Sequence, residues 1–406
     1  MRERDKLLLP LTDAQRAALA ELSVVSLTVR PGGIQVETRG TVGHFDLGGG
    51  DSLVIRPKAT AAGTALAMLS VLRRLGGLQV TADGMSDPDD MTALLVQAYL
   101  SALRKLRRHG LQRGYQRRVS ELPTVRGRLD PVASVMPGPM SRGRVVCAHH
   151  PRAMDIPENT VLRWVTHRLS RLSSTMPAQA RDARELDARL GQIPLRACTA
   201  SDALRCRRSG SFRAYEHALG LAHLLLAGWS WTAGTGRQGG FTWSVNMDLL
   251  FQDWLAHSLS RAPALRGVQV DDDRSLSLAT WRRHAVPARP DLVLRRQGAP
   301  TAVLDAKHIM LRGTPAAGLI QQVLTYGVML GLDEAWLVYP AAPGKTEARR
   351  CWSVARPGQP DFSVWTAPLR LWSGLDVATR DVHLLAEVLA SSRRHAARET
   401  EPTISR

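Results

Sequence analysis

The stretch RPDLVLRRQGAPTAVLDAKHIM, at Arg289–Met310, decides how the C-terminal part of the chain folds. Two apolar runs, LVL and TAVL, flank the turn Gln297–Ala299, and this pattern predicts a β-hairpin with buried strands. Pairing around that turn places Asp291 opposite Asp305, and Lys307 shares a face with Asp305 because side chains alternate along a strand. The sequence therefore predicts that two carboxylates and an ammonium meet at one end of the hairpin.

These three charged groups suit metal-dependent hydrolysis of phosphate esters. Two carboxylates with β-carbons about 5 Å apart repel each other unless a cation lies between them, and hard oxygen ligands favour Mg²⁺ or Mn²⁺. We expect Asp291 and Asp305 to bind the metal, and Lys307, whose pKa can adjust to its surroundings, to activate water. Only five of the 54 lysines and arginines are lysines, so charge alone does not explain Lys307. The alternative is a surface hairpin whose Asp and Lys pair in water, and the apolar runs on both strands argue against it.

Composition indicates a multidomain globular protein with an anionic partner. The 406 residues carry a formal net charge of +18, and a field of that sign attracts phosphate polymers, so DNA is the expected partner. An arginine-rich coding bias is the alternative origin of the excess, although the field remains. We recognise no membrane span or signal peptide, and the four cysteines form no CxxC pair. We therefore expect a cytoplasmic protein with no membrane partner, disulfide scaffold or structural zinc.

Periodicity divides the chain into four parts. We expect a small β-rich N-terminal domain, a helical middle domain with an extended excursion and a short β-pair, an α/β domain, and a C-terminal helix with a frayed tail. Their boundaries are 1–85, 86–235 with the excursion near 117–150, 240–375, and 376–406. The acidic turn SDPDD is expected to cap a long helix, and the glycine-rich link AGTGRQGG ends the middle domain. The fold class is therefore multidomain α+β and α/β.

The hairpin motif resembles a known nuclease pattern. The sequence PD at 290–291, followed by a hydrophobic strand that carries DAK at 305–307, is similar to the PD-(D/E)xK nuclease superfamily. Gln322 and Tyr326 have the QxxxY spacing of its RecB-like branch, which places both on one helical face. An ordinary mixture of helix surface and core is the alternative for this pair. The resemblance implies a restriction-endonuclease-like mixed sheet flanked by helices, a metal site that includes the backbone carbonyl of Ala306, and Mg²⁺-dependent endodeoxyribonuclease activity.

Several further blocks resemble the McrC family, the nuclease subunits of McrBC modified-cytosine restriction systems. In chain order they are LVIRPKA, TVRGRLD at 124–130, MDIPENTVLRWV at 154–165, MDLLFQDWL at 247–255, the hairpin, and QQVLTYGVML followed by LVYP at 337–340. The resemblance implies an endonuclease subunit in phage defence whose N-terminal half docks on and stimulates a McrB-like AAA+ GTPase ring. We find no GxxxxGK phosphate loop in the chain, so the NTP-dependent motor is expected on another polypeptide. Cutting both DNA strands requires a second copy of the nuclease subunit.

One position departs from the McrC pattern. Members usually carry a glutamate after the LF of the helix at 247–255, where this chain has Gln252 followed by Asp253. Either Asp253 takes over from a different helical face, or the site works with two acids and a lysine. A shift of one residue rotates a helical side chain by about 100°, so the second interpretation is favoured, with both residues in supporting positions.

Six arginines are candidates for contacts with DNA or with the partner. They are Arg104, Arg107 and Arg108 on one helical stripe, Arg126 and Arg128 around a glycine turn, and Arg289 beside the hairpin. A solvated helix face and a purely structural turn are the alternatives for the first five.

Two other functions stay open. A non-catalytic adaptor would keep the nuclease fold and serve only to dock on and activate an AAA+ partner, and Gln252 favours this interpretation. A stand-alone RecB-type DNA nuclease would cut without any ring.

Overall fold

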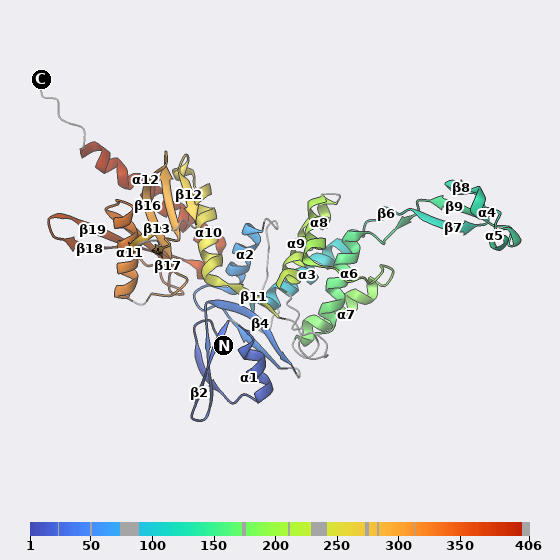
Figure 1. The fold of residues 1–406 in the computed structure, drawn as a ribbon, viewed down its shortest axis with the longest axis horizontal. Coiled ribbons are helices and arrows are strands. Elements are labelled where there is room, and N and C mark those ends of the chain that lie inside the picture. The colour runs from blue at the N-terminus through green and yellow to red at the C-terminus, as the bar shows by residue number, and fades with distance from the viewer. Residues whose placement is uncertain are drawn as a thin grey trace, which may run out of the picture. The chain divides into compact units, whose positions relative to one another are not determined.

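The computed structural model describes most of the chain, and Figure 1 shows how it folds. The described residues are 1–22, 24–48, 51–73, 89–172, 176–209, 212–228, 242–272, 276–281, 284–311 and 313–399. The chain forms two compact units. The first unit consists of Met1–Leu94 and Thr242–Arg406, and the second unit is Leu95–Phe241. The described residues of the N-terminal domain expected at 1–85, and those of the domain expected at 240–375, which begin at Thr242, fall in the first unit. The glycine-rich link AGTGRQGG and the first three residues of SDPDD lie outside the described residues.

The N-terminal part of the first unit is β-rich, as the sequence predicts. One sheet has the order β1 (Lys6–Leu9), β3 (Gly33–Thr38), β2 (Val25–Arg30), and another has the order β11 (Trp243–Asn246), β4 (Thr41–Gly48), β5 (Asp51–Ile55). Helices α1 (Asp13–Ala20) and α2 (Ala62–Leu72) complete this part. Its core contains Leu19 of α1 together with Val36, Phe45 and Ile55 from the strands.

Strand β11 comes from a distant part of the sequence and was not predicted. It pairs antiparallel with β4, so that Gly43 lies opposite Ser244. A Cβ at Gly43 would lie 2.1 Å from the carbonyl oxygen of Trp243, so the close approach of the two strands requires glycine. This pairing joins the N-terminal and C-terminal parts of the first unit.

The second unit is mainly helical. Helix α3 (Met91–Arg108) begins in the first unit, where the Asp90 carboxylate accepts hydrogen bonds from the N–H groups of Thr92 and Ala93, so the acidic turn caps it as predicted. Longer helices of this unit are also α6 (Pro157–Ser170), α7 (Pro177–Arg189), α8 (Ala200–Ser209), which was not predicted, and α9 (Glu216–Gly228). The buried Tyr99 hydroxyl donates to the Leu162 carbonyl over 2.7 Å and ties α3 to α6.

Residues 114–153 leave the helices of the second unit as an arm (Figure 1). Strands β6 (Gly114–Tyr115) and β10 (Arg152–Ala153) form its base. Beyond them lies a three-stranded sheet with the order β7 (Arg118–Leu122), β9 (Val145–His149), β8 (Arg128–Asp130), together with the short helices α4 (Pro131–Ser134) and α5 (Pro137–Ser141). The sequence predicted a short pair of strands in this excursion, and the sheet has three strands. The chain turns after β7 and adds the three residues of β8 to the other edge of β9.

The C-terminal part of the first unit contains a six-stranded mixed sheet. Its order is β12 (Gln269–Asp272), β15 (Leu292–Arg296), β16 (Ala299–Ala306), β17 (Glu334–Pro340), β19 (Gln359–Leu369), β18 (Arg350–Arg356). Strand β17 runs parallel to β16 and β19, and the other neighbours are antiparallel. Strands β13 (Leu276–Trp281) and β14 (His284–Ala288) form a separate hairpin.

Helices bury the strands of the mixed sheet. Helix α11 (Ala317–Met329) contacts the face that carries Val293, Val303 and Leu337. Leu292 and Leu304 point to the opposite face because side chains alternate, and both are fully buried. Helices α10 (Met247–Arg261) and α12 (Leu375–Glu399) contact β16 and β19, respectively. Burial on both faces explains the unbroken apolar runs of the hairpin. None of the described helices combines the length and apolar composition that crossing a membrane requires.

Candidate active site

The predicted hairpin forms, with a different turn from the one expected. Gln297 and Gly298, with φ angles of 50° and 83°, make a two-residue turn, and Ala299 already pairs with Arg296. A β-bulge between Leu294 and Arg295 then shifts the register by one residue. The bulge compensates for the shorter turn, so the pairing at the other end of the hairpin is the predicted one.

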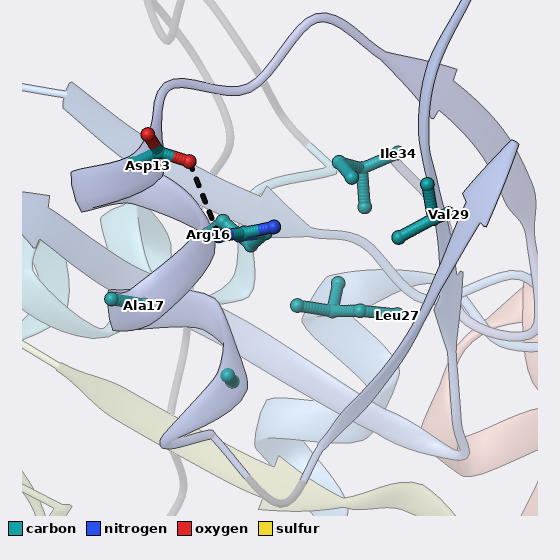
Figure 2. Close-up of a pocket in the computed structure, with 7 residues that line it drawn as sticks. Asp13, Arg16, Ala17, Leu27, Val29 and Ile34 are labelled. Carbon is teal, nitrogen blue, oxygen red and sulfur yellow. Dashed lines mark ion pairs between the residues drawn. The ribbon is translucent and has the colours of Figure 1, made fainter. Parts of the chain in front are cut away.

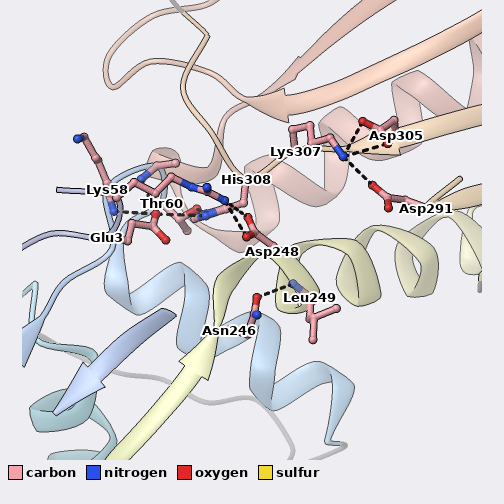
Figure 3. A network of polar contacts seen from close by, with 12 residues as sticks. Glu3, Lys58, Thr60, Asn246, Asp248, Leu249, Asp291, Asp305, Lys307 and His308 are labelled. Carbon is pink, nitrogen blue, oxygen red and sulfur yellow. Dashed lines mark hydrogen bonds and ion pairs between the residues drawn. The ribbon is translucent and has the colours of Figure 1, made fainter. Parts of the chain in front are cut away.

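At that end the three predicted side chains meet. Leu292 pairs with Leu304, which places the preceding Asp291 opposite Asp305. The Lys307 Nζ atom lies 3.1 Å from Asp305 Oδ1, 2.9 Å from Asp305 Oδ2 and 3.8 Å from Asp291 Oδ2 (Figure 3). The geometry expected from the sequence is therefore present.

Backbone hydrogen bonds hold the carboxylates and the lysine in place. The Ala306 N–H donates to Asp291 Oδ2 over 2.8 Å, which connects the strand of one acid to the side chain of the other. The Lys307 N–H donates to the Val338 carbonyl over 2.9 Å, so the residue after β16 is still tied to β17. Lys307 extends from a strand end that is fastened on both sides.

Burial and mutual repulsion set the charge states. Burial first, and the Asp305 charge second, raise the pKa of Asp291 to about 6, although Lys307 and the Ala306 N–H act in the opposite direction. For Lys307 burial is the largest single influence and lowers the pKa, but Asp305 and Asp291 together outweigh it and the pKa is raised. The pKa of Lys307 is therefore shifted in the direction that keeps its side chain a protonated ammonium.

The two carboxylates fit a divalent cation. Asp305 is 0% exposed, and its Oδ2 atom has no aligned hydrogen-bond donor among the described residues, although the Lys307 ammonium lies at ion-pair distance. Two carboxylates face a single ammonium, so the three groups carry one excess negative charge when both acids are ionised. The described residues contain no group of three or more His, Cys, Asp or Glu side chains that would hold a metal. A metal bound here would need backbone carbonyl or water oxygens as further ligands, which Mg²⁺ accepts.

Gln252 and Asp253 lie in different surroundings. The Gln252 Nε2 atom donates to the backbone carbonyl of Asp291 over 3.3 Å, so this amide faces the site. Burial and the charge of Asp272 raise the pKa of Asp253, and Arg73 lowers it, so the charged groups around Asp253 are not those of the site. Of these two residues, Gln252 is therefore the one that contacts the site.

Gln322 and Tyr326 contact each other on one face of α11. The Gln322 Nε2 atom donates to the Tyr326 hydroxyl over 2.8 Å, and Tyr326 is 7% exposed. Tyr326 is among the groups whose charge raises the pKa of Lys307, so this face of the helix lies towards the site.

The candidate arginines divide into paired and exposed groups. Arg104 is bound to Asp182 over 2.5 Å and helps to hold α3 to α7. Arg107 is partly buried, whereas Arg108 is exposed. Arg289 is also exposed, two residues before Asp291.

Arg126 and Arg128 are exposed on either side of Gly127, in the predicted turn of the arm. Gly127 has a φ of +75°, and a Cβ there would lie 2.5 Å from the Ala148 carbonyl oxygen. The turn is therefore structural, and it presents two arginines to solvent.

The sequence did not reveal that the arm exposes many apolar side chains. Those exposed by 38% or more are Tyr115, Val119, Val125, Leu129, Val132, Val135, Met136 and Met140. The signal in the sequence was a run of apolar residues, PVASVMPGPM, in a segment without a strand or helix period. Exposed apolar groups gathered on a short segment indicate a binding surface.

A pocket of about 330 Å³ lies elsewhere, between α1 and the strands β2 and β3 (Figure 2). Leu27, Val29 and Ile34 line it, and the ion pair Asp13–Arg16 lies at its edge. It contains none of the residues predicted for the hairpin site.

Comparisons with known proteins agree with this architecture. No curated protein matches the chain. A chain of the structure "Refined half-complex from tetradecameric assembly of Thermococcus gammatolerans McrB AAA+ hexamers with bound McrC" is similar with a TM-score of 0.65 and 15% identity, over 95% of this chain and 98% of that chain. A chain of the "Cryo-EM structure of the Thermococcus gammatolerans McrBC complex" matches with a TM-score of 0.47 and 16% identity, over 64% of this chain and 87% of that chain.

The family match covers most of the chain. The family described as "McrBC 5-methylcytosine restriction system component" matches residues 36–340. This range begins in the β-rich N-terminal part, runs through the second unit and ends with β17. The family resemblance drawn from the sequence is confirmed: the chain belongs to the family of McrBC 5-methylcytosine restriction system components.

Proposed function

We propose that the chain is the nuclease subunit of a McrBC-type, NTP-dependent restriction system and hydrolyses phosphodiester bonds in DNA that carries modified cytosine. The observation that carries this proposal is the meeting of Asp291, Asp305 and Lys307 at the end of a buried hairpin. Burying three charges costs several kcal/mol unless they are compensated or used. A metal-dependent endonuclease of the PD-(D/E)xK type uses them.

The residues of the chain have distinct parts in this chemistry. Asp291, Asp305 and the backbone carbonyl of Ala306 would hold Mg²⁺ or Mn²⁺, which when bound lowers the pKa of a water molecule and polarises a phosphate oxygen. Lys307 stays protonated and stabilises the charge that develops on the phosphate in the transition state. Gln252 holds the backbone of Asp291.

Binding partners follow from the basic charge and from the arm. The net charge of +18 attracts DNA, and Arg289, exposed beside the hairpin, is positioned to contact its backbone. The exposed apolar side chains of the arm dock on a McrB-like AAA+ GTPase ring and stimulate it, with Arg126 and Arg128 at the tip of the β7–β8 turn. A second copy of the chain supplies the cut in the other strand. The complex acts in the cytoplasm.

The test is cleavage of a plasmid that contains modified cytosine by the chain in complex with its AAA+ partner, GTP and Mg²⁺. Lys307→Ala is expected to lower the cleavage rate by at least about 100-fold, because it removes a charge aimed at the transition state. Lys345→Ala, which removes an exposed lysine, is the matched control and leaves cleavage intact. Equal rates for the two variants would contradict the proposed site.

A non-catalytic adaptor is the second candidate, and Gln252 supports it because the site has two acids rather than three. This function predicts that the wild-type complex leaves modified DNA intact while the chain still raises GTP hydrolysis by its partner. Measuring both activities in one sample separates the two functions.

A further inference from the structure

The Lys307 end of the hairpin is fastened to the N-terminal segment through the next residue, His308. Glu3 and His308 are each 1% exposed, and Glu3 Oε1 lies 3.2 Å from His308 Nδ1 (Figure 3). The other ring nitrogen, Nε2, lies 2.6 Å from the Thr60 hydroxyl. A buried carboxylate and imidazole therefore connect residue 3 to the position that follows the lysine of the site.

Glu3 is itself held rigidly. Its Oε1 atom accepts hydrogen bonds from the N–H groups of Lys58 and Ala59, at 3.1 and 3.3 Å, and its own N–H donates to the Arg56 carbonyl over 2.9 Å. A buried charge fixed by backbone donors does not follow small shifts of its partner. The contacts of the His308 ring thus hold the backbone after Lys307 in a fixed position against the N-terminal segment.

Arg4, the residue after Glu3, contacts helix α10, which carries Gln252 of the site. The Arg4 Nη2 atom lies 2.7 Å from both carboxylate oxygens of Asp248. Asp248 is one helical turn before Gln252 on α10, and Gln252 binds the Asp291 carbonyl. The Gly40 carbonyl accepts from the Met247 N–H over 2.8 Å at the start of the same helix.

We propose that Glu3 and His308 are positioning residues of the nuclease site, with Arg4 and Asp248 in a secondary role. They hold the Lys307 strand end and helix α10 in one arrangement, so the site is complete only while the segment Met1–Asp5 is docked against it. This inference rests on the proposed nuclease function. None of these four residues belongs to the predicted metal ligands.

The test compares Glu3→Gln and His308→Gln with Glu37→Gln, which removes only the exposed Lys6–Glu37 ion pair. In the complete complex we expect the first two variants to lower kcat by about 10- to 100-fold with KM within about twofold, because misplacing a reacting group by about 1 Å has effects of this size. The double variant should be no worse than either single variant, since the two residues act as a unit. Glu37→Gln leaves both constants unchanged.

Hydrogen exchange supplies a readout that does not depend on cleavage. In Glu3→Gln and His308→Gln we expect faster exchange than in Glu37→Gln for the peptide at 305–309, which includes the Lys307 amide that donates to Val338. If the wild-type complex does not cut DNA, the proposed function fails, and the exchange rates still decide whether Glu3 fastens the strand end. If the exchange rates at 305–309 and the kcat values of both variants equal those of the wild type, the positioning role is overturned.

A second variant covers the case in which the buried substitutions prevent folding. Arg4→Gln removes a half-exposed ion pair, which typically contributes no more than about 1 kcal/mol, so this variant folds. We expect a several-fold loss of kcat and faster exchange at 247–253. Arg16→Gln, which removes the exposed pair with Asp13, is its control, and identical behaviour of the two arginine variants would contradict the role of the segment.

Discussion

The hairpin end at Asp291, Asp305 and Lys307 and the arm at 114–153 deviate from ordinary burial in opposite directions. In the hairpin, charged groups lie on buried strands, and Asp305 has no exposed surface. In the arm, apolar side chains such as Val132 and Met140 are 74% and 68% exposed. Both arrangements cost free energy in the isolated chain, since a buried charge loses water and an exposed apolar group orders it. The proposed function assigns a ligand to each region, a cation and a phosphate to the hairpin end and an apolar protein surface to the arm.

The proposed explanation of the hairpin end fails most clearly if its buried charges are dispensable for cleavage. Asp305→Asn keeps the shape of the side chain and removes one of two acids, so we expect cleavage of modified DNA to fall by at least about 1000-fold, the combined size of lost metal binding and lost electrostatic stabilisation. Asp333→Asn, at a position where the side chain is 80% exposed, is the control. Cleavage and GTPase stimulation are measured together, and stimulation by Asp305→Asn should equal that of the wild type.

The arm is tested by making its apolar surface polar. The double substitution Val132→Asp and Met140→Asp should reduce stimulation of the partner GTPase by about 10- to 100-fold, as expected for contacts at the centre of an interface. The thermal midpoint should stay unchanged because neither side chain is buried. Val29→Asp, which alters a valine 73% exposed on β2, is the matched control. Equal stimulation by the two proteins would show that the arm is not the docking surface.

These two regions also show what the sequence alone can predict. The hairpin was predictable because its signals are local: apolar runs, a glycine turn and charged residues at fixed spacing. Its register was correct even though the turn is shorter than expected, since the bulge after Leu294 compensates. The third strand of the arm, with only the three residues of β8, is too short to produce a periodic signal.

Contacts between distant residues were not predictable. The pairing of β4 with β11 and the contact between Glu3 and His308 join residues that lie far apart in the sequence, and no local pattern reports them. The direction of the pKa shift of Lys307 was not predictable from the sequence for a related reason. It depends on whether two carboxylates outweigh burial, which only the assembled site decides.

Gln252 sharpens the comparison, because it decides how much negative charge the buried site holds. Gln252→Glu loses the hydrogen bond to the Asp291 carbonyl but adds a third acid, and each added ligand charge strengthens divalent cation binding. We expect Mg²⁺ to bind about 10-fold more tightly, as measured by calorimetry of the isolated chain. Weaker binding would mean that the amide serves mainly to hold the backbone of Asp291.

The smallest expected effect concerns stability without metal. Burial first, and the Asp305 charge second, raise the pKa of Asp291 from 3.8 to about 6. An acid whose pKa is raised by folding contributes its stability fully below about pH 4 and loses it as the pH rises through about 6. In metal-free protein at pH 8, Asp291→Asn should therefore raise Tm by about 2–4 °C, for a gain of about 1 kcal/mol.

The same variant separates the cost of the buried charges from their use. Near pH 3 the Tm of Asp291→Asn should equal that of the wild type, because Asp291 is then mostly protonated in both the folded and the unfolded chain. At pH 8, Mg²⁺ should raise Tm of the wild type and leave that of the variant unchanged, since only the wild type retains both acids. If the variant is less stable than the wild type in metal-free buffer at pH 8, the Lys307 ammonium already compensates both carboxylates. The site would then be a structural ion pair, and the hairpin and the arm would no longer deviate from ordinary burial for the same reason.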